Sequence, residues 1–208
     1  IGLLLDHGAD GRTRYQGHSA YALARIRGNR EAARRLEKAG QATELDANEQ
    51  LLAAAADGEV AGRVDADTLS AESRRLICRL LGFAGPPPLA HIKRLVEIGI
   101  SPDWTDEMGL PAVQVAGWEG HADAVEWLLT FNPDLEHRNR FGGDLMETIL
   151  HGAQYNPHLA DRDHRRCAEL VLATGVRFSR RLIDQTGSED LAFTLEAWAE
   201  AHPEQVKS

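Results

Sequence analysis

Six side chains within residues 151–167 are of the types that bind metal ions: His151, His158, Asp161, Asp163, His164 and Cys167. Imidazole, thiolate and carboxylate are the usual zinc ligands, but the spacing here matches no standard zinc pattern. Only His164 and Cys167, three residues apart, would share a helix face. The favoured interpretation is a solvated loop followed by a helix, with Asp161 or Asp163 as its N-cap and Cys167 in the core.

The common sequence signatures of catalysis are missing. The chain has no G-x-S-x-G, no P-loop and no HExxH, which argues against the common hydrolase and nucleotide-binding classes. Cys78 and Cys167 are the two cysteines, and they form no CxxC motif. A disulfide framework is therefore not indicated, and a reducing, cytoplasmic location fits. We expect no enzymatic activity, no metal and no cofactor.

The composition favours helices and a charged surface. Of 208 residues 43% are hydrophobic but only 6% aromatic, while Ala, Leu, Arg and Glu abound, which predicts an all-α fold. An apolar run long enough to cross a membrane is missing. Residues 11–43 carry a net charge of +6, whereas residues 44–208 carry −13. The overall charge of −9 opposes nucleic-acid binding and favours a partner with a basic surface.

Glycines recur with a period of about 33 residues. Gly109 and Gly142 each precede a helical pattern and lie 33 residues apart, and Gly8 and Gly40 lie 32 apart. Between such glycines the chain shows two short apolar-periodic segments, separated in one unit by Gly120 as the hinge. In that unit we expect Val113, Val125 and Leu128 in the core. Helices this short are marginal alone, so the units must stack on their neighbours.

In these features the sequence resembles the ankyrin repeat family. The best match is "DEMGLPAVQVAGWEGHADAVEWLL" from Asp106, with the turn glycine, an alanine in the first helix and Gly120-His121. Further matches are "RYQGHSAYALARIRGNREAARRLEKAG" and "NRFGGDLMETILHGA". The resemblance implies an all-α solenoid of stacked helix-turn-helix units with a C-terminal helical cap. We expect a divergent array of bacterial type that is truncated before Ile1.

The whole chain, 1–208, is expected to form one ankyrin repeat domain. Residues 1–12 would end a partial repeat, 13–43, 46–69, 70–101, 105–137 and 138–178 would be repeats, and 179–208 the cap. The 46–69 unit keeps a first helix and a Gly58 hinge but has a shortened second helix. In the family, the Thr and His of a T-P-L-H motif link neighbouring turns by hydrogen bonds. That motif is replaced here by "SAYA", "PAVQ" and "DLME", which predicts a less stable array.

Ankyrin proteins usually bind partners through the turn tips and the exposed ends of the first helices. Carried over residue by residue, the resemblance implicates Tyr15, Gln16, His18, Ile26, Arg27, Glu107, Met108, Leu110, Trp118, Glu119, Arg140, Phe141, Leu150 and His151. Trp and Tyr at exposed positions matter most, because they dominate interface hot spots. For Trp118, packing against a neighbouring unit is equally open. For Phe141 packing is favoured, and Trp127 is expected in the core.

The predicted function is therefore a non-enzymatic protein-protein interaction module. It would be a monomer that binds a partner protein, possibly with a basic surface, and neither nucleic acid nor membrane. One alternative is a metal-dependent or other enzymatic activity in the 151–167 insertion. Another is a structural spacer within a longer protein.

Overall fold

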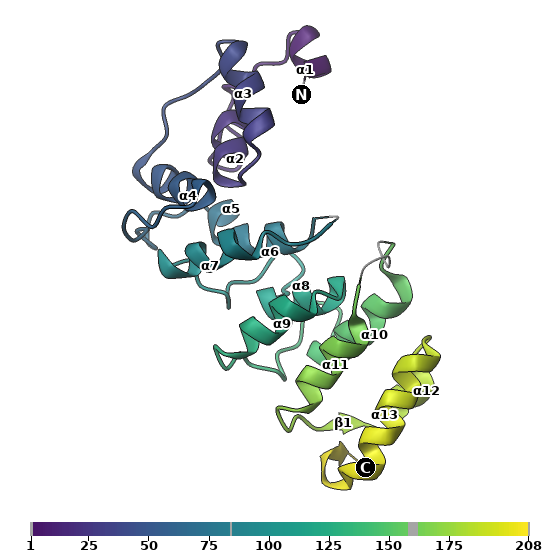
Figure 1. Cartoon of the computed structure of the whole chain (residues 1–208). Helices are drawn as coiled ribbons and strands as arrows, with labels where there is room; N and C mark the ends of the chain where they lie inside the picture. The colour runs from purple at the N-terminus through teal and green to yellow at the C-terminus, as the bar shows by residue number, and fades with distance from the viewer. Residues whose placement is uncertain (1, 84, 158–161, 208) are drawn as a thin grey trace. The chain divides into compact units, whose positions relative to one another are not determined.

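Short helices are the main regular structure of the described chain. The computed structural model describes residues 2–83, 85–157 and 162–207. They form two compact units, one of residues 1–80 and 88–101, the other of residues 81–87 and 102–208 (Figure 1). The expected all-α class is confirmed. In the described part of the chain the longest helix has 13 residues, and none is long and apolar enough to cross a membrane.

The first unit contains the helices up to α7: α1 (Gly2–Asp6), α2 (Ala20–Ile26), α3 (Arg30–Lys38), α4 (Ala47–Asp57), α5 (Ala71–Arg74), α6 (Leu76–Leu81) and α7 (Leu89–Glu97). Leu81, the last residue of α6, already belongs to the second unit. Helices α2 and α3 form a hairpin, and α4 packs against α2 and α7.

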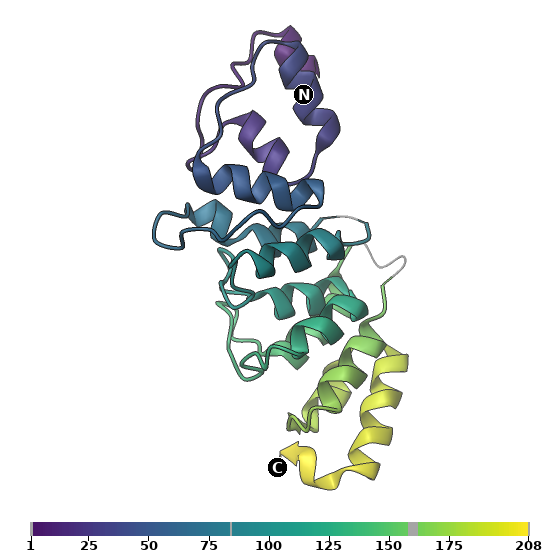
Figure 2. The same ribbon diagram turned by 60° about the vertical axis from the view of Figure 1, so that its left-hand side comes forward.

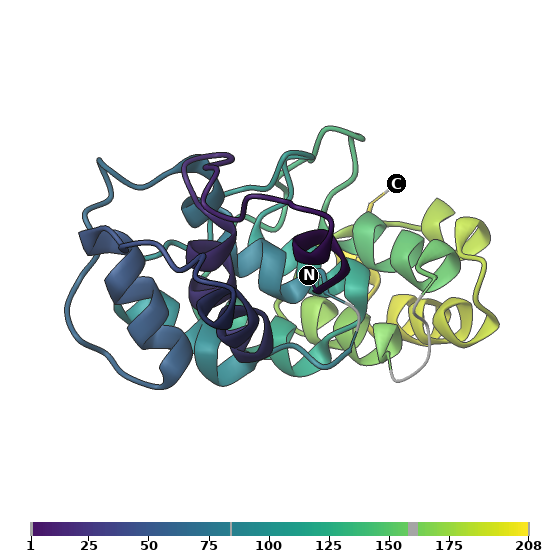
Figure 3. The same cartoon turned by 90° about the horizontal axis from the view of Figure 1, so that it is seen from above.

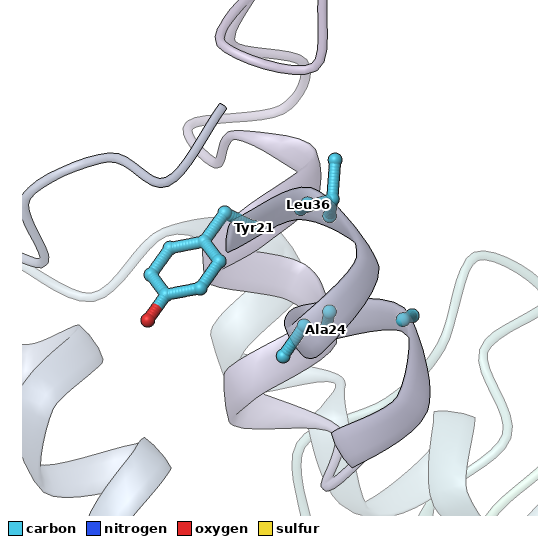
Figure 4. Close-up of a cluster of buried hydrophobic side chains, with 5 residues drawn as sticks. Tyr21, Ala24 and Leu36 are labelled. Carbon is cyan, nitrogen blue, oxygen red and sulfur yellow. The ribbon is translucent and has the colours of Figure 1, made fainter. Parts of the chain in front are cut away.

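The α2–α3 hairpin encloses a small core. Ser19 and Asn29 cap the two helices by accepting hydrogen bonds from backbone amides, which satisfies donors that a helix N-terminus otherwise leaves open. Tyr21, Ala24 and Leu36 belong to this cluster of buried side chains (Figure 4). Each helix thus buries the apolar face that it could not bury alone.

The prediction of a shortened second helix after Gly58 is wrong. Residues 59–70 hold turns and extended chain instead of a helix, and the segment is tied to the end of α7 by the amide of Val64 donating to the carbonyl of Ile98. Gly62 adopts a φ of +157°, which only glycine accepts readily. This segment also has too few regularly spaced apolar residues to bury a helix face.

The second unit contains α8 (Ala112–Glu119), α9 (Ala122–Leu129), α10 (Leu145–Tyr155), α11 (His164–Leu172), α12 (Arg181–Gln185) and α13 (Glu189–Ala201), with the 3-10 turn η1 (Pro203–Gln205). Helix α8 packs against α9 and α10, and α11 against α9, α10 and α13. The helices of this unit lie in successive rows in Figure 2. Seen from above in Figure 3, the loops that precede α8 and α10 project to one side.

Core and hinge predictions for the α8–α9 pair are confirmed. Val113, Val125 and Leu128 are buried. Gly120 ends α8 in the left-handed conformation, with φ +69°, as a C-terminal glycine cap does. Trp127 is only half-buried and meets Phe131 edge to face, so its expected core position is corrected to the margin of the core.

Two closing helices were expected at the C-terminus and are present as α12 and α13. In addition, β1 (Phe178–Ser179) and β2 (Val206–Lys207) pair in parallel, with Phe178 opposite Val206. The sequence does not predict these strands, because two residues are too few to show an alternating apolar pattern.

At Gly152, helix α10 lies directly against the backbone of α8. A Cβ at this position would lie 2.3 Å from the carbonyl oxygen of Trp118, a distance that no Cβ tolerates. We expect Gly152→Ala to lower the free energy of unfolding by about 1–3 kcal/mol through overpacking, measured by urea denaturation. This sign is diagnostic, because an unhindered Gly→Ala change within a helix stabilises by about 1 kcal/mol.

Gly143→Ala is the matched control, since a Cβ there would meet its nearest atoms at 3.6 Å. A Gly152→Ala protein as stable as the wild type would contradict the close approach of the two helices.

Candidate functional site

The predicted contact residues divide by exposure. Exposed residues are Tyr15, Gln16, Met108, Arg140, Phe141 and His151. Half-buried residues are Arg27, Glu107, Leu110 and Trp118. Buried residues are His18, Ile26, Glu119 and Leu150. The exposure expected for the last four is corrected: their side chains are directed into the protein and are not accessible to a partner.

The reasons for burial differ between the apolar and the polar pair. Ile26 and Leu150 are 0% and 6% exposed, because they fall on the inner faces of α2 and α10. In a helix of only a few turns, a shift of one residue rotates the side chain by about 100°. His18 and Glu119 are held instead by buried polar partners.

Tyr15 stands at the tip of a tight hairpin. Its backbone exchanges two hydrogen bonds with His18, and the residues between them, Gln16 and Gly17, have φ of +52° and +91°. Two consecutive positive φ values are those of a type I′ turn. The tyrosine side chain is 70% exposed, so the first unit presents it to solvent as predicted.

His18 lies at the centre of a buried polar relay. Its Nδ1 is 2.7 Å from the carboxylate of Glu49, and its Nε2 is 2.6 Å from the hydroxyl of Ser70. Because a carboxylate only accepts, Nδ1 carries a proton, and Nε2 faces the hydroxyl groups of Ser70 and Ser73. Arg14 donates a further bond to the same oxygen of Glu49, at 2.8 Å. Gly17 permits the approach, since a Cβ there would meet that of Ser70 at 3.2 Å.

The electrostatics of Glu49 fit this relay. Burial alone would raise the pKa of Glu49, but hydrogen bonds from Arg14, His18 and the backbone of Asp46 outweigh it and lower the pKa. The carboxylate therefore stays charged although it is 1% exposed. The hydrogen bonds that join the loop before α2 to the starts of α4 and α5 thus depend on one buried charge.

Serine, histidine and carboxylate in this order also occur in hydrolytic triads. Here the Ser70 hydroxyl is engaged as the N-cap of α5, accepting from the amide of Ser73. The Ser73 hydroxyl also lies 3.1 Å from Nε2 of His18. The Ser70 hydroxyl donates to the Ser73 hydroxyl at 3.1 Å, so its proton is already engaged, which suits a structural tie better than an activated nucleophile.

Three aromatic side chains form a partly exposed cluster at the C-terminal ends of α8 and α10. The ring centroids of Trp118 and His151 are 5.2 Å apart, and those of His151 and Tyr155 are 4.6 Å apart, both pairs edge to face. His151 and Tyr155 are four residues apart and so share one face of α10. Tyr155 is 59% exposed. We call Trp118, His151 and Tyr155 the aromatic cluster.

Tyr155 is the member that the sequence prediction missed. It lies one helical turn beyond His151, where α10 runs longer than the family pattern. The signal was the i, i+4 spacing of two aromatic rings. The open question for Trp118 also gains an answer: its ring is half-buried and borders the cluster. Phe141, for which packing was favoured, is 74% exposed.

The backbone beneath the aromatic cluster is held by side chains from two other segments. The carbonyl oxygen of Trp118 accepts from the side-chain amide of Asn156 at 3.1 Å and from Nε2 of His164 at 3.0 Å. The carbonyl of Gly120 accepts from the amide of Asp163 at 2.9 Å. These bonds satisfy carbonyls that the end of a helix leaves open, and they fix the position from which the tryptophan ring projects.

A buried charge pair lies next to these bonds. Arg162 and Glu119 are 3.2 Å apart, with side chains 4% and 8% exposed. The Nη1 of Arg162 also lies 2.6 Å from Nδ1 of His121, while Nε2 of His121 is 3.2 Å from the carbonyl of Leu81. The same Nη1 also lies 2.6 Å from Nε2, so the guanidinium group is close to both nitrogens of the ring. Burial, with Arg162 next in weight, lowers the pKa of His121 to about 4.

The residues proposed as metal ligands are largely accounted for by other contacts. Asp163 caps α11 by accepting from the amide of Arg166, and Cys167 is fully buried; both expectations are confirmed. Burial raises the pKa of Cys167 to about 12, far from a metal-binding thiolate. His158 and Asp161 lie outside the described residues. Within the described ranges, no group of three or more His, Cys, Asp or Glu is placed to hold a metal ion.

Comparison with known proteins gives no assignment. A scan against models of protein families finds no match, and neither does a search of the curated proteins.

Glu49 tests the relay in the first unit. Glu49→Gln keeps the shape of the side chain but removes the buried charge that Arg14 and His18 share. We expect the free energy of unfolding to fall by about 2–3 kcal/mol. Glu31→Gln is the control: Glu31 pairs with Arg35 on the surface, so its loss should leave the urea midpoint nearly unchanged. Equal urea midpoints for the two variants would refute the role of the relay.

The lowered pKa of His121 predicts that the second unit loses stability in acid. With a folded pKa near 4 and an unfolded value of about 6.5, the unfolded state binds more protons between these values. Stability from this group is complete above about pH 6.5 and is lost as the pH falls towards 4. The loss amounts to about 3 kcal/mol.

Urea denaturation at pH 7.0 and 4.5 would measure this loss. His121→Gln cannot take up the proton, so the drop in stability between the two pH values should be smaller by roughly that amount. An unchanged drop would show that His121 is not held neutral.

Proposed function

We propose that this chain is a divergent ankyrin repeat array and that it works as a non-enzymatic protein-binding module. The periodic turns support the fold assignment. Gly109 and Gly142 both have positive φ, +76° and +83°, and each precedes the first helix of a pair. Neighbouring turns are joined, because the amide of Arg140 donates to the carbonyl of Met108 at 2.9 Å.

Side-chain links between the turns add to this support. His137 bonds to the carbonyl of Gly109 at 2.8 Å. Asn139 donates to Gln114 and to Thr148, each at 3.1 Å. These amide and hydroxyl groups supply hydrogen bonds of the kind that the family obtains from its T-P-L-H motif. A repeat array without that motif can therefore still join its units.

The observation that carries the binding function is the aromatic cluster. It combines the ends of two first helices, which is where the family exposes its contact residues. A partly exposed tryptophan and tyrosine offer large rigid contact areas at small entropic cost, and such residues dominate interface hot spots. The exposed Tyr15 provides a similar contact in the first unit. Binding through such a surface needs no reacting centre.

The charge of the chain favours a protein partner with a basic surface. A net charge of −9 repels nucleic acids and attracts cationic surfaces. The proposed module is a cytoplasmic monomer that binds neither nucleic acid nor membrane.

Capture of partners from a native lysate tests the proposal. We expect Trp118→Ala, Tyr15→Ala or both to reduce the recovery of a specific partner by 10-fold or more, as the loss of a hot spot does. Phe193→Ala is the control, because Phe193 is 71% exposed on α13 but is not a predicted contact. Recovery should be scored by quantitative mass spectrometry of the captured proteins. A partner retained equally by all three variants would count against the proposed surface.

A further inference from the structure

We propose that the aromatic cluster is a subsite for a cationic side chain, arginine or lysine, from the partner. This inference rests on the proposed function and specifies the chemistry of its contact. Three observations lead to it: the geometry of the rings, the charge of the second unit, and the state of the arginines beside α10.

The geometry provides ring faces to a cation. The ring planes of Trp118 and His151 are inclined at 66°, and those of His151 and Tyr155 at 71°. Rings inclined in this way border a corner instead of forming a flat stack. The faces of Trp and Tyr rings carry negative electrostatic potential and attract a cation within about 6 Å. His151 and Tyr155 are exposed, so a side chain can reach the corner.

The negative charge of the second unit favours a cationic ligand over a neutral apolar one. Residues 81–87 and 102–208, which form the second unit, contain 19 acidic and nine basic residues, a net charge of −10. The remaining residues are close to balance, at +1. The acidic excess of the whole chain therefore belongs to the unit that carries the aromatic cluster.

The chain's own arginines next to α10 are already engaged. Arg162 is buried against Glu119, and Arg181 pairs with Glu147. These pairs hold both guanidinium groups at carboxylates. The cation proposed for the aromatic cluster is one supplied by the partner.

The test compares two peptides that differ only in charge. One is an eight-residue Gly/Ser peptide with three arginines, and the other carries citrulline, the neutral isostere, at the same positions. We expect the arginine peptide to bind at least 5-fold more tightly in calorimetry at 0.15 M salt. In nitrogen-15 NMR spectra it should shift the Trp118 indole signal, assigned by loss of that signal in Trp118→Phe.

Variants then localise the binding. Tyr155→Leu should weaken the arginine peptide by about 3- to 10-fold, whereas Tyr155→Phe should bind within 2-fold of the wild type because it keeps the ring. Phe193→Leu removes an exposed ring elsewhere in the same unit without a change in charge, and should have no effect. Circular dichroism and thermal melting verify that each variant is folded.

Two results would overturn the proposal: equal affinity for the arginine and citrulline peptides, or Tyr155→Leu binding as well as Tyr155→Phe. Both differ from failure of the proposed function, which is measured by partner capture. A partner that requires Trp118, combined with no preference for arginine, would reject the cation subsite and keep the binding module.

Discussion

The packing of the second unit depends on the carbonyl oxygen of Trp118 and on the absence of a side chain at Gly152 beside it. This one acceptor receives bonds from Asn156, just after α10, and from His164, at the start of α11. Gly152 lets α10 come close enough for that arrangement, since any side chain there would collide with the same oxygen. Three helices are thereby positioned by one peptide group, and the tryptophan ring projects from a backbone that is fixed. A contact residue held in this way loses little freedom on binding.

The first unit solves the same problem with a buried charge. Its helices are short, and isolated helices of this length are marginal. The carboxylate of Glu49 joins the loop before α2 to α4, while His18 extends the link to Ser70 and Ser73. Such a network stabilises only when every member has its partner, because an unpaired charge in the interior is costly. The two units thus use different polar groups for one purpose, which is to hold short helices at the distance where their apolar faces can pack.

The sequence predicts those features that depend on neighbouring residues in the chain, and it fails for those that depend on distant ones. Gly120 and Asp163 were correctly interpreted because a left-handed cap and an N-cap depend on the nearest few residues. The burial of Val113 and Leu128 followed from helical periodicity. The exposure of Ile26 and Leu150 was wrongly predicted, because on a short helix the choice of face depends on which neighbour packs there. His18 looked like a turn-tip residue, and only the approach of Glu49 and Ser70, distant in sequence, turns it inwards. Tyr155 was missed because α10 continues past the pattern on which the prediction relied.

Charge and aromatic contacts have separate effects on recognition, and the second unit keeps them apart. The carboxylates that neutralise its buried arginine, such as Glu119, are enclosed and act on the fold. Exposed carboxylates such as Asp184 contribute instead to the electrostatic field around the protein. An acidic surface raises the association rate of cationic partners, and salt screens this effect. Ring contacts are short-ranged and insensitive to salt, so they govern how long a partner stays. On the proposed function, a unit with both properties would discriminate in two stages: the net charge would favour basic proteins at encounter, and the corner formed by Trp118, His151 and Tyr155 would retain those that present a cationic side chain at the right place.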